Sequence, residues 1–270
     1  MSAAASHPAH PARLVSGAHP GPTTPPAPAR GPHGIVVADR DRRGTRPGPP
    51  PAPARGPDGI LFDLDGTLVD TIGLIIASFQ YAVRAVLGAD LDATTARSWI
   101  GRPLLPVLLD LSPEHGAEID RVYREWNLAH TAKHIRPYAG VSAMLAGLAT
   151  AGRPIAIVTS KRRVSAELAL ASVGLTGAIP IAMTLEDTQA HKPDPEPLLA
   201  GATWLGIPAG RCAYVGDATV DVLAARAAGM TAVAVTWGAG EREALVATGP
   251  DLVCDSVGEL AAYLGVGTTV

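Results

Sequence analysis

The stretch that decides the fold reads Phe62-Asp63-Leu64-Asp65-Gly66-Thr67-Leu68-Val69-Asp70-Thr71. It follows an apolar run, and the two together predict a buried strand over residues 59–64. Because side chains alternate along a strand, Asp63 and Asp65 should leave its carboxyl end on the same side. Gly66 then permits a sharp turn. Two carboxylates that converge on one point repel each other unless a cation or a shared proton lies between them.

A hard divalent ion such as Mg²⁺ relieves this repulsion, because such ions prefer oxygen ligands. A Ca²⁺-binding loop is the first alternative, but it requires further acids where Leu68 and Val69 stand. The stretch therefore predicts a Mg²⁺ site at Asp63 and Asp65, with one carboxylate left free for chemistry.

The composition of the chain limits the classes of protein it can belong to. It has 270 residues, 47% of them hydrophobic, which is enough for one or two packed domains. A formal charge of −3 gives no indication of nucleic acid or of a membrane surface as a partner. No apolar run approaches the roughly 18–20 residues that span a bilayer. Two cysteines, Cys212 and Cys254, are too few for a disulfide framework, so a cytoplasmic location is expected.

Residues 1–57 have a composition of their own. They hold 14 of the 25 prolines and seven Arg against two Asp, a local charge of +5. Such a segment cannot bury enough apolar surface to offset its ordering entropy, so we expect a disordered arm. Residues 26–32 recur identically as residues 51–57. Residues 34–37 resemble the predicted strand at 59–62, but Ala38 and Arg40 stand where Asp63 and Asp65 follow that strand. The upstream copy therefore indicates a decayed duplication or an upstream extension that is not translated.

The rest of the chain is predicted to form a doubly wound parallel α/β sheet. Short apolar strands at 154–158, 179–183, 212–215 and 231–235 alternate with helices at 140–151, 163–173, 195–205 and 219–228. This alternation is typical of a parallel sheet that is covered by helices on both faces. Ligands of such sheets gather at the carboxyl ends of the strands.

Residues 74–136 are predicted to be a small helical domain inserted after the first strand. The pattern there breaks at Gly88, at 101–103 and at Ser112-Pro113, where a new helix is predicted to start. The core is then expected to comprise residues 58–73 and 137–270.

Three further segments follow predicted strands and carry candidate functional groups. Thr159 and Ser160 open a helix whose amides and hydroxyls can hold phosphate oxygens, although an ordinary helix cap is the alternative. Lys192 lies in a loop stiffened by three prolines, where a fixed ammonium can neutralise a phosphoryl group and keep Asp63 ionised. His191 is expected to be a neighbour of the site.

Asp217 and Asp221 follow the strand at 212–215. Asp217 can complete an oxygen cage with the carboxylate of Asp63 and the backbone carbonyl of Asp65. Asp221, four residues on, lies on the same helix face and can hold a metal-bound water. Capping of the helix alone is the alternative for this acid pair.

These four segments resemble the motifs of the haloacid dehalogenase (HAD) superfamily, whose phosphatases carry Asp-x-Asp-Gly-Thr-Leu-x-Asp-Thr after the first strand. The resemblance covers residues 58 to about 265. It implies that Asp63 attacks phosphorus and that Asp65 acts as acid and base, with Lys192 as the third catalytic group. It also implies phosphate binding by Thr159, Ser160 and Lys192, and Mg²⁺ binding by Asp63, Asp65, Asp217 and Asp221.

The same resemblance implies a phosphatase that hydrolyses a small phosphomonoester through an aspartyl-phosphate intermediate. Phosphoglycolate phosphatases and their pyrophosphatase relatives are the most similar group, with the helical insertion as a mobile lid. Arg102, in the lid's substrate-facing loop, is the expected substrate contact. The alternatives are an inorganic pyrophosphatase and a sugar-phosphate phosphatase or mutase. Gly216 disfavours the mutase, and Asp65 disfavours a dehalogenase.

Two readings of another class remain. One is a HAD-like binding protein without catalysis, which the intact acids and Lys192 argue against. The other is a regulatory or nucleic-acid-associated protein that acts through the Arg-rich arm. The expected partner is a small phosphorylated metabolite, with no nucleic acid and no membrane, and the expected assembly is a monomer or a homodimer.

Overall fold

A computed structural model describes residues 56–268 of the chain. The predicted arm and its internal repeat therefore lie almost wholly outside the described residues. The described part begins with Gly56 and Pro57, and the carbonyl of Pro57 accepts a hydrogen bond from the Arg153 guanidinium.

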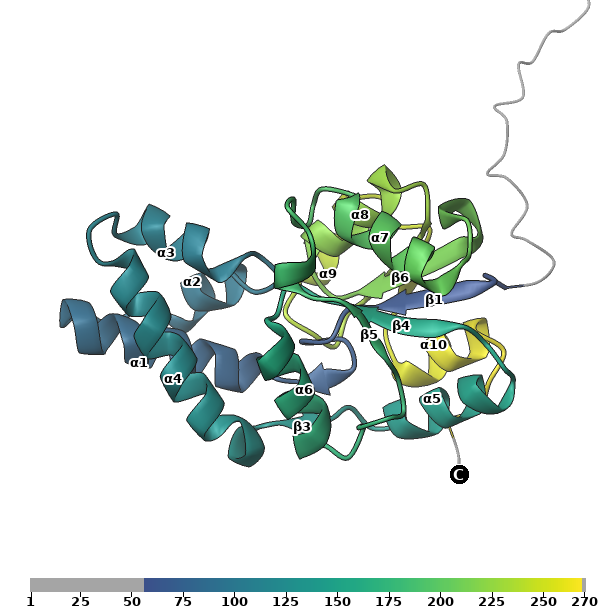
Figure 1. Ribbon diagram of the computed structural model, residues 1–270, viewed down its shortest axis with the longest axis horizontal. Helices are drawn as coiled ribbons and strands as arrows, with labels where there is room; N and C mark the ends of the chain where they lie inside the picture. The colour runs from purple at the N-terminus through teal and green to yellow at the C-terminus, as the bar shows by residue number, and fades with distance from the viewer. Residues whose placement is uncertain (1–55, 269–270) are drawn as a thin grey trace, which may run out of the picture. The chain divides into compact units, whose positions relative to one another are not determined.

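A six-stranded parallel sheet forms the centre of the core (Figure 1). Its strand order is β5-β4-β1-β6-β7-β8. The strands are β1 (Gly59–Phe62), β4 (Ile155–Val158), β5 (Ile181–Met183), β6 (Cys212–Gly216), β7 (Thr231–Val235) and β8 (Leu252–Cys254). Phe62 is in register with Ile157 on one side and with Val215 on the other, so the carboxyl ends of β4, β1 and β6 are level.

Helices cover both faces of this sheet because its central strand is apolar on both sides. Ile60 and Phe62 of β1 belong to one buried cluster, and Leu61 between them belongs to the other. The first face is covered by α5 (Val141–Thr150), α6 (Arg163–Ser172) and α10 (Val257–Tyr263), and the second by α7 (Glu196–Leu205), α8 (Thr219–Ala227) and α9 (Arg242–Ala247). This architecture confirms the predicted doubly wound α/β fold.

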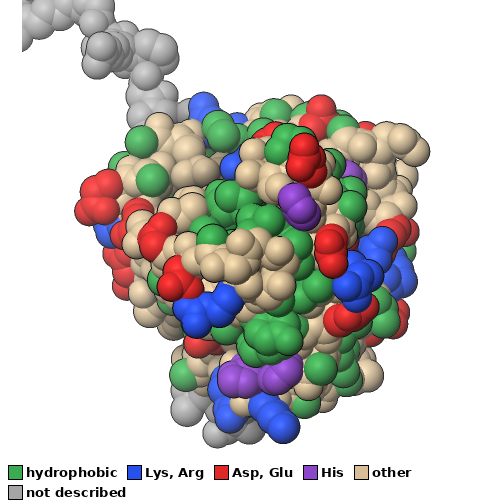
Figure 2. Space-filling model, turned by 90° about the vertical axis from the view of Figure 1, so that its left-hand side faces the viewer, with side chains coloured by type: hydrophobic (Ala, Val, Ile, Leu, Met, Phe, Trp, Pro, Cys, Tyr) green, Lys and Arg blue, Asp and Glu red, His purple; other side chains and the backbone are tan. Residues whose placement is uncertain are grey.

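Four helices lie between β1 and β4 in the chain, and they are here called the cap. They are α1 (Ile72–Leu87), α2 (Ala93–Ser98), α3 (Leu104–Leu111) and α4 (Gly116–His134). They pack around a third apolar cluster that includes Phe79 and Ile119. On the side of the cap seen in Figure 2, acidic and basic side chains are interspersed with apolar ones.

The chain passes from core to cap before α1 and returns to the core after α4, and these two connecting segments pair as a short two-stranded ribbon. β2 (Val69–Asp70) pairs antiparallel with β3 (Arg136–Pro137). Neither strand is predicted from the sequence, because a two-residue strand has no periodicity to detect. The segment that leads into the cap therefore lies beside the segment that leads back to the core.

The predicted start of α4 at Ser112 is wrong. Ser112 has an extended backbone and its amide donates to the carbonyl of Leu108, so it ends α3. Its hydroxyl and carbonyl then accept from the amides of His115 and Gly116, and α4 begins at Gly116. Beyond residue 235, β8, α9 and α10 were not predicted from the sequence.

Two short 3-10 helices, η1 (Leu185–Asp187) and η2 (Ala209–Arg211), complete the elements. Both cysteines are free and buried. No helix between residues 56 and 268 is long and apolar enough to cross a bilayer.

Candidate active site

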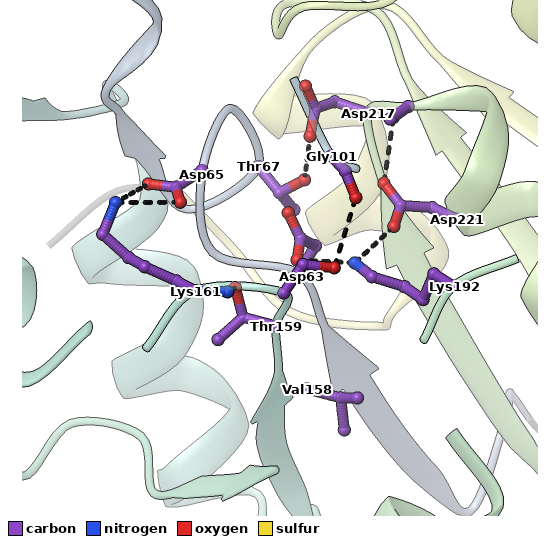
Figure 3. Close-up of polar contacts among 12 residues, drawn as sticks. Asp63, Asp65, Thr67, Gly101, Val158, Thr159, Lys161, Lys192, Asp217 and Asp221 are labelled. Carbon is purple, nitrogen blue, oxygen red and sulfur yellow. Dashed lines mark hydrogen bonds and ion pairs between the residues drawn. The ribbon is translucent and has the colours of Figure 1, made fainter. Parts of the chain in front are cut away.

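Three buried carboxylates meet at the carboxyl ends of β1 and β6 (Figure 3). Each of Asp63, Asp217 and Asp221 offers an oxygen within 4.8 Å of the others. Asp63 directly follows β1, and its amide donates to the carbonyl of Val215 at 2.8 Å, which continues the strand pairing. Two adjacent parallel strands thus deliver acids that are more than 150 positions apart in the chain.

Burial makes this group of acids electrostatically unbalanced. Desolvation raises the pKa of Asp63 to about 7, although the ammonium of Lys192 acts against it. Desolvation, together with the charges of Asp221 and Asp63, raises the pKa of Asp217 well above its ordinary value. When all three acids are ionised, one ammonium among three carboxylates leaves an excess of negative charge. Buried oxygen donors with such an excess suit a hard divalent cation, so the donor set fits Mg²⁺.

The Asp217 carboxylate is held rigidly by two loops. Its Oδ1 accepts from the Thr67 hydroxyl at 2.9 Å, and its Oδ2 accepts from the Ala239 amide at 2.7 Å. Gly66, with φ +83°, and Gly238 both pack so closely that a Cβ at either position would overlap this carboxylate. The structure thus explains Gly66 by a close approach as well as by the turn that the sequence predicts.

Lys192 is buried between the acids, with all three of its N–H donors engaged. Its Nζ lies 2.9 Å from Asp63 Oδ1, 2.6 Å from Asp221 Oδ1 and 2.9 Å from the Tyr214 hydroxyl. Burial alone lowers its pKa, but the carboxylates of Asp221 and Asp63 outweigh this effect and raise the pKa well above its ordinary value. Lys192 is therefore a charged partner of the acids, and a phosphate contact would require exchange of one of these bonds.

Tyr214 is a site residue that the sequence analysis missed. Its hydroxyl accepts from Lys192 and donates to the carbonyl of Val158 at 2.8 Å, which connects the ammonium to the end of β4. The sequence places Tyr214 in an apolar strand, and nothing local to that strand indicates its distant partner.

Asp221 uses both carboxylate oxygens within the protein. Oδ1 accepts from Lys192, and Oδ2 accepts from the Ala218 amide at 2.9 Å at the start of α8. The predicted role of Asp221 as holder of a metal-bound water stays a prediction, and the helix cap that we weighed against it is present.

The Asp65 carboxylate points away from the three-acid group (Figure 3). Both of its oxygens accept from Lys161 Nζ, at 2.9 and 3.0 Å. Asp65 thus lies apart from the other predicted metal-binding carboxylates, and only its backbone carbonyl remains as the predicted ligand. From the sequence, Lys161 is a further candidate for phosphate binding next to Thr159 and Ser160, and its pairing with Asp65 is not predicted.

Thr159 and Ser160 lie at the end of β4, as predicted. Thr159 is buried, and its Oγ1 accepts from the Lys161 amide at 3.2 Å. The Ser160 hydroxyl donates to the carbonyl of Gly101 in the cap at 3.2 Å. Ser160 therefore joins core to cap.

A cavity of about 90 Å³ separates the acids from the cap, and both Asp63 and Asp65 line it. Its cap side is aromatic, with Phe79 and Tyr123 rings 4.8 Å apart between centroids. Arg102 is exposed and lines the cavity. The other cationic side chains of the lining are Arg124, Lys161 and Arg162.

Comparisons with known proteins agree with this geometry. Residues 60–235 match the family described as haloacid dehalogenase-like hydrolase. The chain belongs to this family. A relative from Caldanaerobacter subterraneus subsp. tengcongensis, provisionally named pyrophosphatase PpaX, is 36% identical over 200 residues, which are 74% of this chain and 91% of the relative. The pyrophosphatase PpaX of Halalkalibacterium halodurans is 34% identical over 206 residues, which are 76% of this chain and 96% of the relative.

A solved structure supports the fold. A protein from Haemophilus somnus 129pt, described as a predicted phosphoglycolate phosphatase, superimposes with a TM-score of 0.68. The match covers 76% of this chain and 96% of that protein at 22% identity. The chain is an enzyme, a phosphatase of the HAD-like hydrolases, which is the family that its motifs resemble.

Proposed function

We propose that this HAD-like phosphatase hydrolyses a small phosphate compound with Mg²⁺, through a phosphorylated Asp63. The observation that supports this most strongly is the position of Asp63. It is only 4% exposed, it is paired with Lys192, it lies among two further acids, and it lines the cavity. A carboxylate held in this way can meet a phosphorus atom in one orientation.

The proposed reaction has two steps. A carboxylate oxygen of Asp63 attacks phosphorus, the bond to the leaving oxygen breaks, and that oxygen takes a proton from Asp65. Water then attacks the phosphorus of the aspartyl-phosphate and gives a proton to Asp65, which frees Asp63 and inorganic phosphate. Lys192 favours the ionised form of Asp63, which is the nucleophile.

Asp65 must leave Lys161 to perform this role. Its carboxylate is bonded to Lys161 Nζ, and both side chains line the cavity. A phosphate group entering the cavity competes for the same ammonium and releases Asp65 toward the leaving oxygen. We also propose that Thr159 and Ser160 bind the phosphate oxygens at this edge.

We propose that Mg²⁺ is held by the carboxylates of Asp63 and Asp217 and by the backbone carbonyl of Asp65. Asp221 is proposed to hold a water molecule bound to the ion. When bound, the ion offsets the repulsion between the phosphate oxygens and the acids. Two bonds within the protein, from the Thr67 hydroxyl and the Ala239 amide, fix the orientation of the Asp217 carboxylate toward this site.

The substrate is proposed to be a small phosphomonoester with an anionic leaving group, of the phosphoglycolate kind. The cavity is small, and its lining includes three Arg and Lys161. We further propose that the cap, residues 74–136, acts as the lid over the core formed by 58–73 and 137–270. Arg102 is the proposed contact for the leaving group.

Pyrophosphate is the second candidate substrate. It is favoured by the two relatives named pyrophosphatase PpaX, which are 36% and 34% identical to this chain. The same cationic lining suits a leaving phosphate.

The test is a substrate panel of phosphoglycolate, pyrophosphate and a sugar phosphate, run with Mg²⁺ and with a chelator. We expect Mg²⁺-dependent release of phosphate, with one of the first two compounds preferred. Asp63→Asn should lower turnover by about 10³-fold or more. The matched control is Asp110→Asn, an exposed cap residue outside the cavity, which should retain the wild-type rate. Undiminished turnover in the chelator, or in Asp63→Asn, would refute the proposal.

A further inference from the structure

Arg97 belongs to the cap, yet its guanidinium is bonded to a loop of the core. It lies on α2, its Nη2 donates to the carbonyl of Gly238 at 2.7 Å, and its Nε donates to the carbonyl of Ala239 at 3.0 Å. Within residues 56–268 Arg97 forms no ion pair with a carboxylate, so these two carbonyl oxygens are its polar partners. The fork of a guanidinium matches two adjacent carbonyls in a way that a lysine ammonium cannot.

The loop that Arg97 holds is the loop that holds Asp217. The amide of Ala239 donates to Asp217 Oδ2 at 2.7 Å, and the amide of Gly240 donates to the Asp217 carbonyl at 3.1 Å. A Cβ at Gly238 would overlap the Asp217 carboxylate, so there is no free space between loop and acid. A displacement of this loop must therefore displace or release the Asp217 carboxylate.

A second contact ties the cap to the residue after Asp217. Gly101 in the cap packs so closely on Ala218 that a Cβ at Gly101 would lie 2.8 Å from the Ala218 Cβ. The cap thus touches the Asp217 region from two sides, through Arg97 and through Gly101.

We propose that Arg97 is a positioning residue through which closure of the cap sets the orientation of Asp217. The cap then completes the cation site as well as covering the substrate. The proposal rests on the proposed function, in which Asp217 holds Mg²⁺. Linkage is reciprocal, so a closed cap tightens Mg²⁺ binding and bound Mg²⁺ favours the closed cap.

The test compares Arg97→Gln, Arg97→Lys and the control Arg121→Gln in the full chain. Arg121 is an exposed cap residue on α4, and among residues 56–268 its one ion-pair partner is Glu125, also in the cap. Two quantities are measured: the Mg²⁺ dissociation constant by calorimetry, and amide hydrogen exchange of the segment containing Ala239 in metal-free protein. Neither depends on turnover.

Arg97→Gln is expected to weaken Mg²⁺ binding about tenfold, because a charged donor to two carbonyls is lost. Exchange at Ala239 should rise by about the same factor, because the loop opens more readily. Arg97→Lys should show intermediate values, since it keeps the charge and one donor. Arg121→Gln should equal the wild type in both measurements.

The outcomes separate this inference from the proposed function. Wild-type protein that binds no Mg²⁺ would contradict the metal role, and the exchange measurement would still decide on Arg97. Equal Mg²⁺ affinity, or equal exchange at Ala239, in folded Arg97→Gln and wild type would overturn the coupling. Should Arg97→Gln fail to fold, Arg97→Lys carries the same test, and wild-type values in that variant would overturn the coupling.

Discussion

Lys192 is a buried cation among three buried carboxylates, and its loss should be costly. Lys192→Met removes the charge that pairs with Asp63 and Asp221 but keeps most of the side-chain volume. Leaving buried acids without their partner is expected to lower the free energy of unfolding by about 3–5 kcal/mol. Urea unfolding at pH 7 measures this. A loss of under about 1 kcal/mol, the value of an exposed ion pair, would contradict the burial argument.

Tyr214 should matter through its hydroxyl alone. Tyr214→Phe keeps the ring but removes the group that links Lys192 to the Val158 carbonyl. We expect a loss of about 1–2 kcal/mol in the free energy of unfolding, together with reduced turnover. Tyr263→Phe is the control, because Tyr263 is half-buried and its hydroxyl makes no hydrogen bond within the described chain. Equal unfolding free energies for the two variants would show that the Tyr214 hydroxyl is not stabilising.

Some of these residues were predicted from the sequence and others were not. Asp63 and Asp217 were predicted because each follows a strand, and strands of a parallel sheet end at one edge. Lys192 was predicted from its proline-rich loop, and Asp221 from its position one helical turn after Asp217. The bond between Asp65 and Lys161 was not predicted, because 96 positions separate the two residues. The alternation of side chains along a strand also does not determine which rotamer the Asp65 side chain adopts.

At the scale of elements, the alternation of strands and helices from 140 to 235 was predicted to within about two residues. That region has strong apolar periodicity. β2 and β3 lack it because they are two residues long, and α4 was misplaced because a Ser-Pro pair suits a turn as well as a helix start. The short α2 depends instead on its cap, since the Asp92 side chain accepts from the amides of Thr94 and Thr95.

Asp92→Ala tests how firmly α2 is held. Loss of the N-cap is expected to lower the free energy of unfolding by about 1 kcal/mol and to speed amide exchange in α2, which carries Arg97. The exchange rates of α2 and of α4 report this within one sample. Asp110→Ala, an exposed acid in α3, should change neither. Unchanged exchange in α2 would mean that packing, and not the cap, holds the helix.

At the scale of the whole molecule, the buried acids predict how stability depends on pH. The pKa of Asp63 is raised from an ordinary 3.8 to about 7, so between these values the folded protein binds a proton that the unfolded chain has lost. Without metal, this acid should therefore make the free energy of unfolding fall as pH rises from about 4 to about 7. Unfolding in chelator at several pH values measures this fall.

Mg²⁺ should reverse that fall, because a cation compensates the ionised acids. In Asp63→Asn the fall between about pH 4 and 7 should be smaller than in wild type. A fall of the same size in both proteins would assign the pH dependence to other groups.

The predicted site residues all lie between positions 63 and 221, so the N-terminal arm should be dispensable for turnover. Removing residues 1–55, and retaining Pro57 whose carbonyl bonds to Arg153, is expected to leave the hydrolysis rate within about twofold of wild type. Phosphate release by the two forms decides this. A large loss would favour the regulatory reading of the Arg-rich segment.

In the proposed mechanism, Asp63 carries the phosphoryl group during turnover. The most direct measurement is acid quenching during steady-state hydrolysis of the preferred substrate, followed by mass spectrometry of the proteolysed protein. We expect one phosphoryl group on the peptide that contains Asp63, and none in Asp63→Asn. A phosphoryl group on any other residue of the active wild-type enzyme would contradict it.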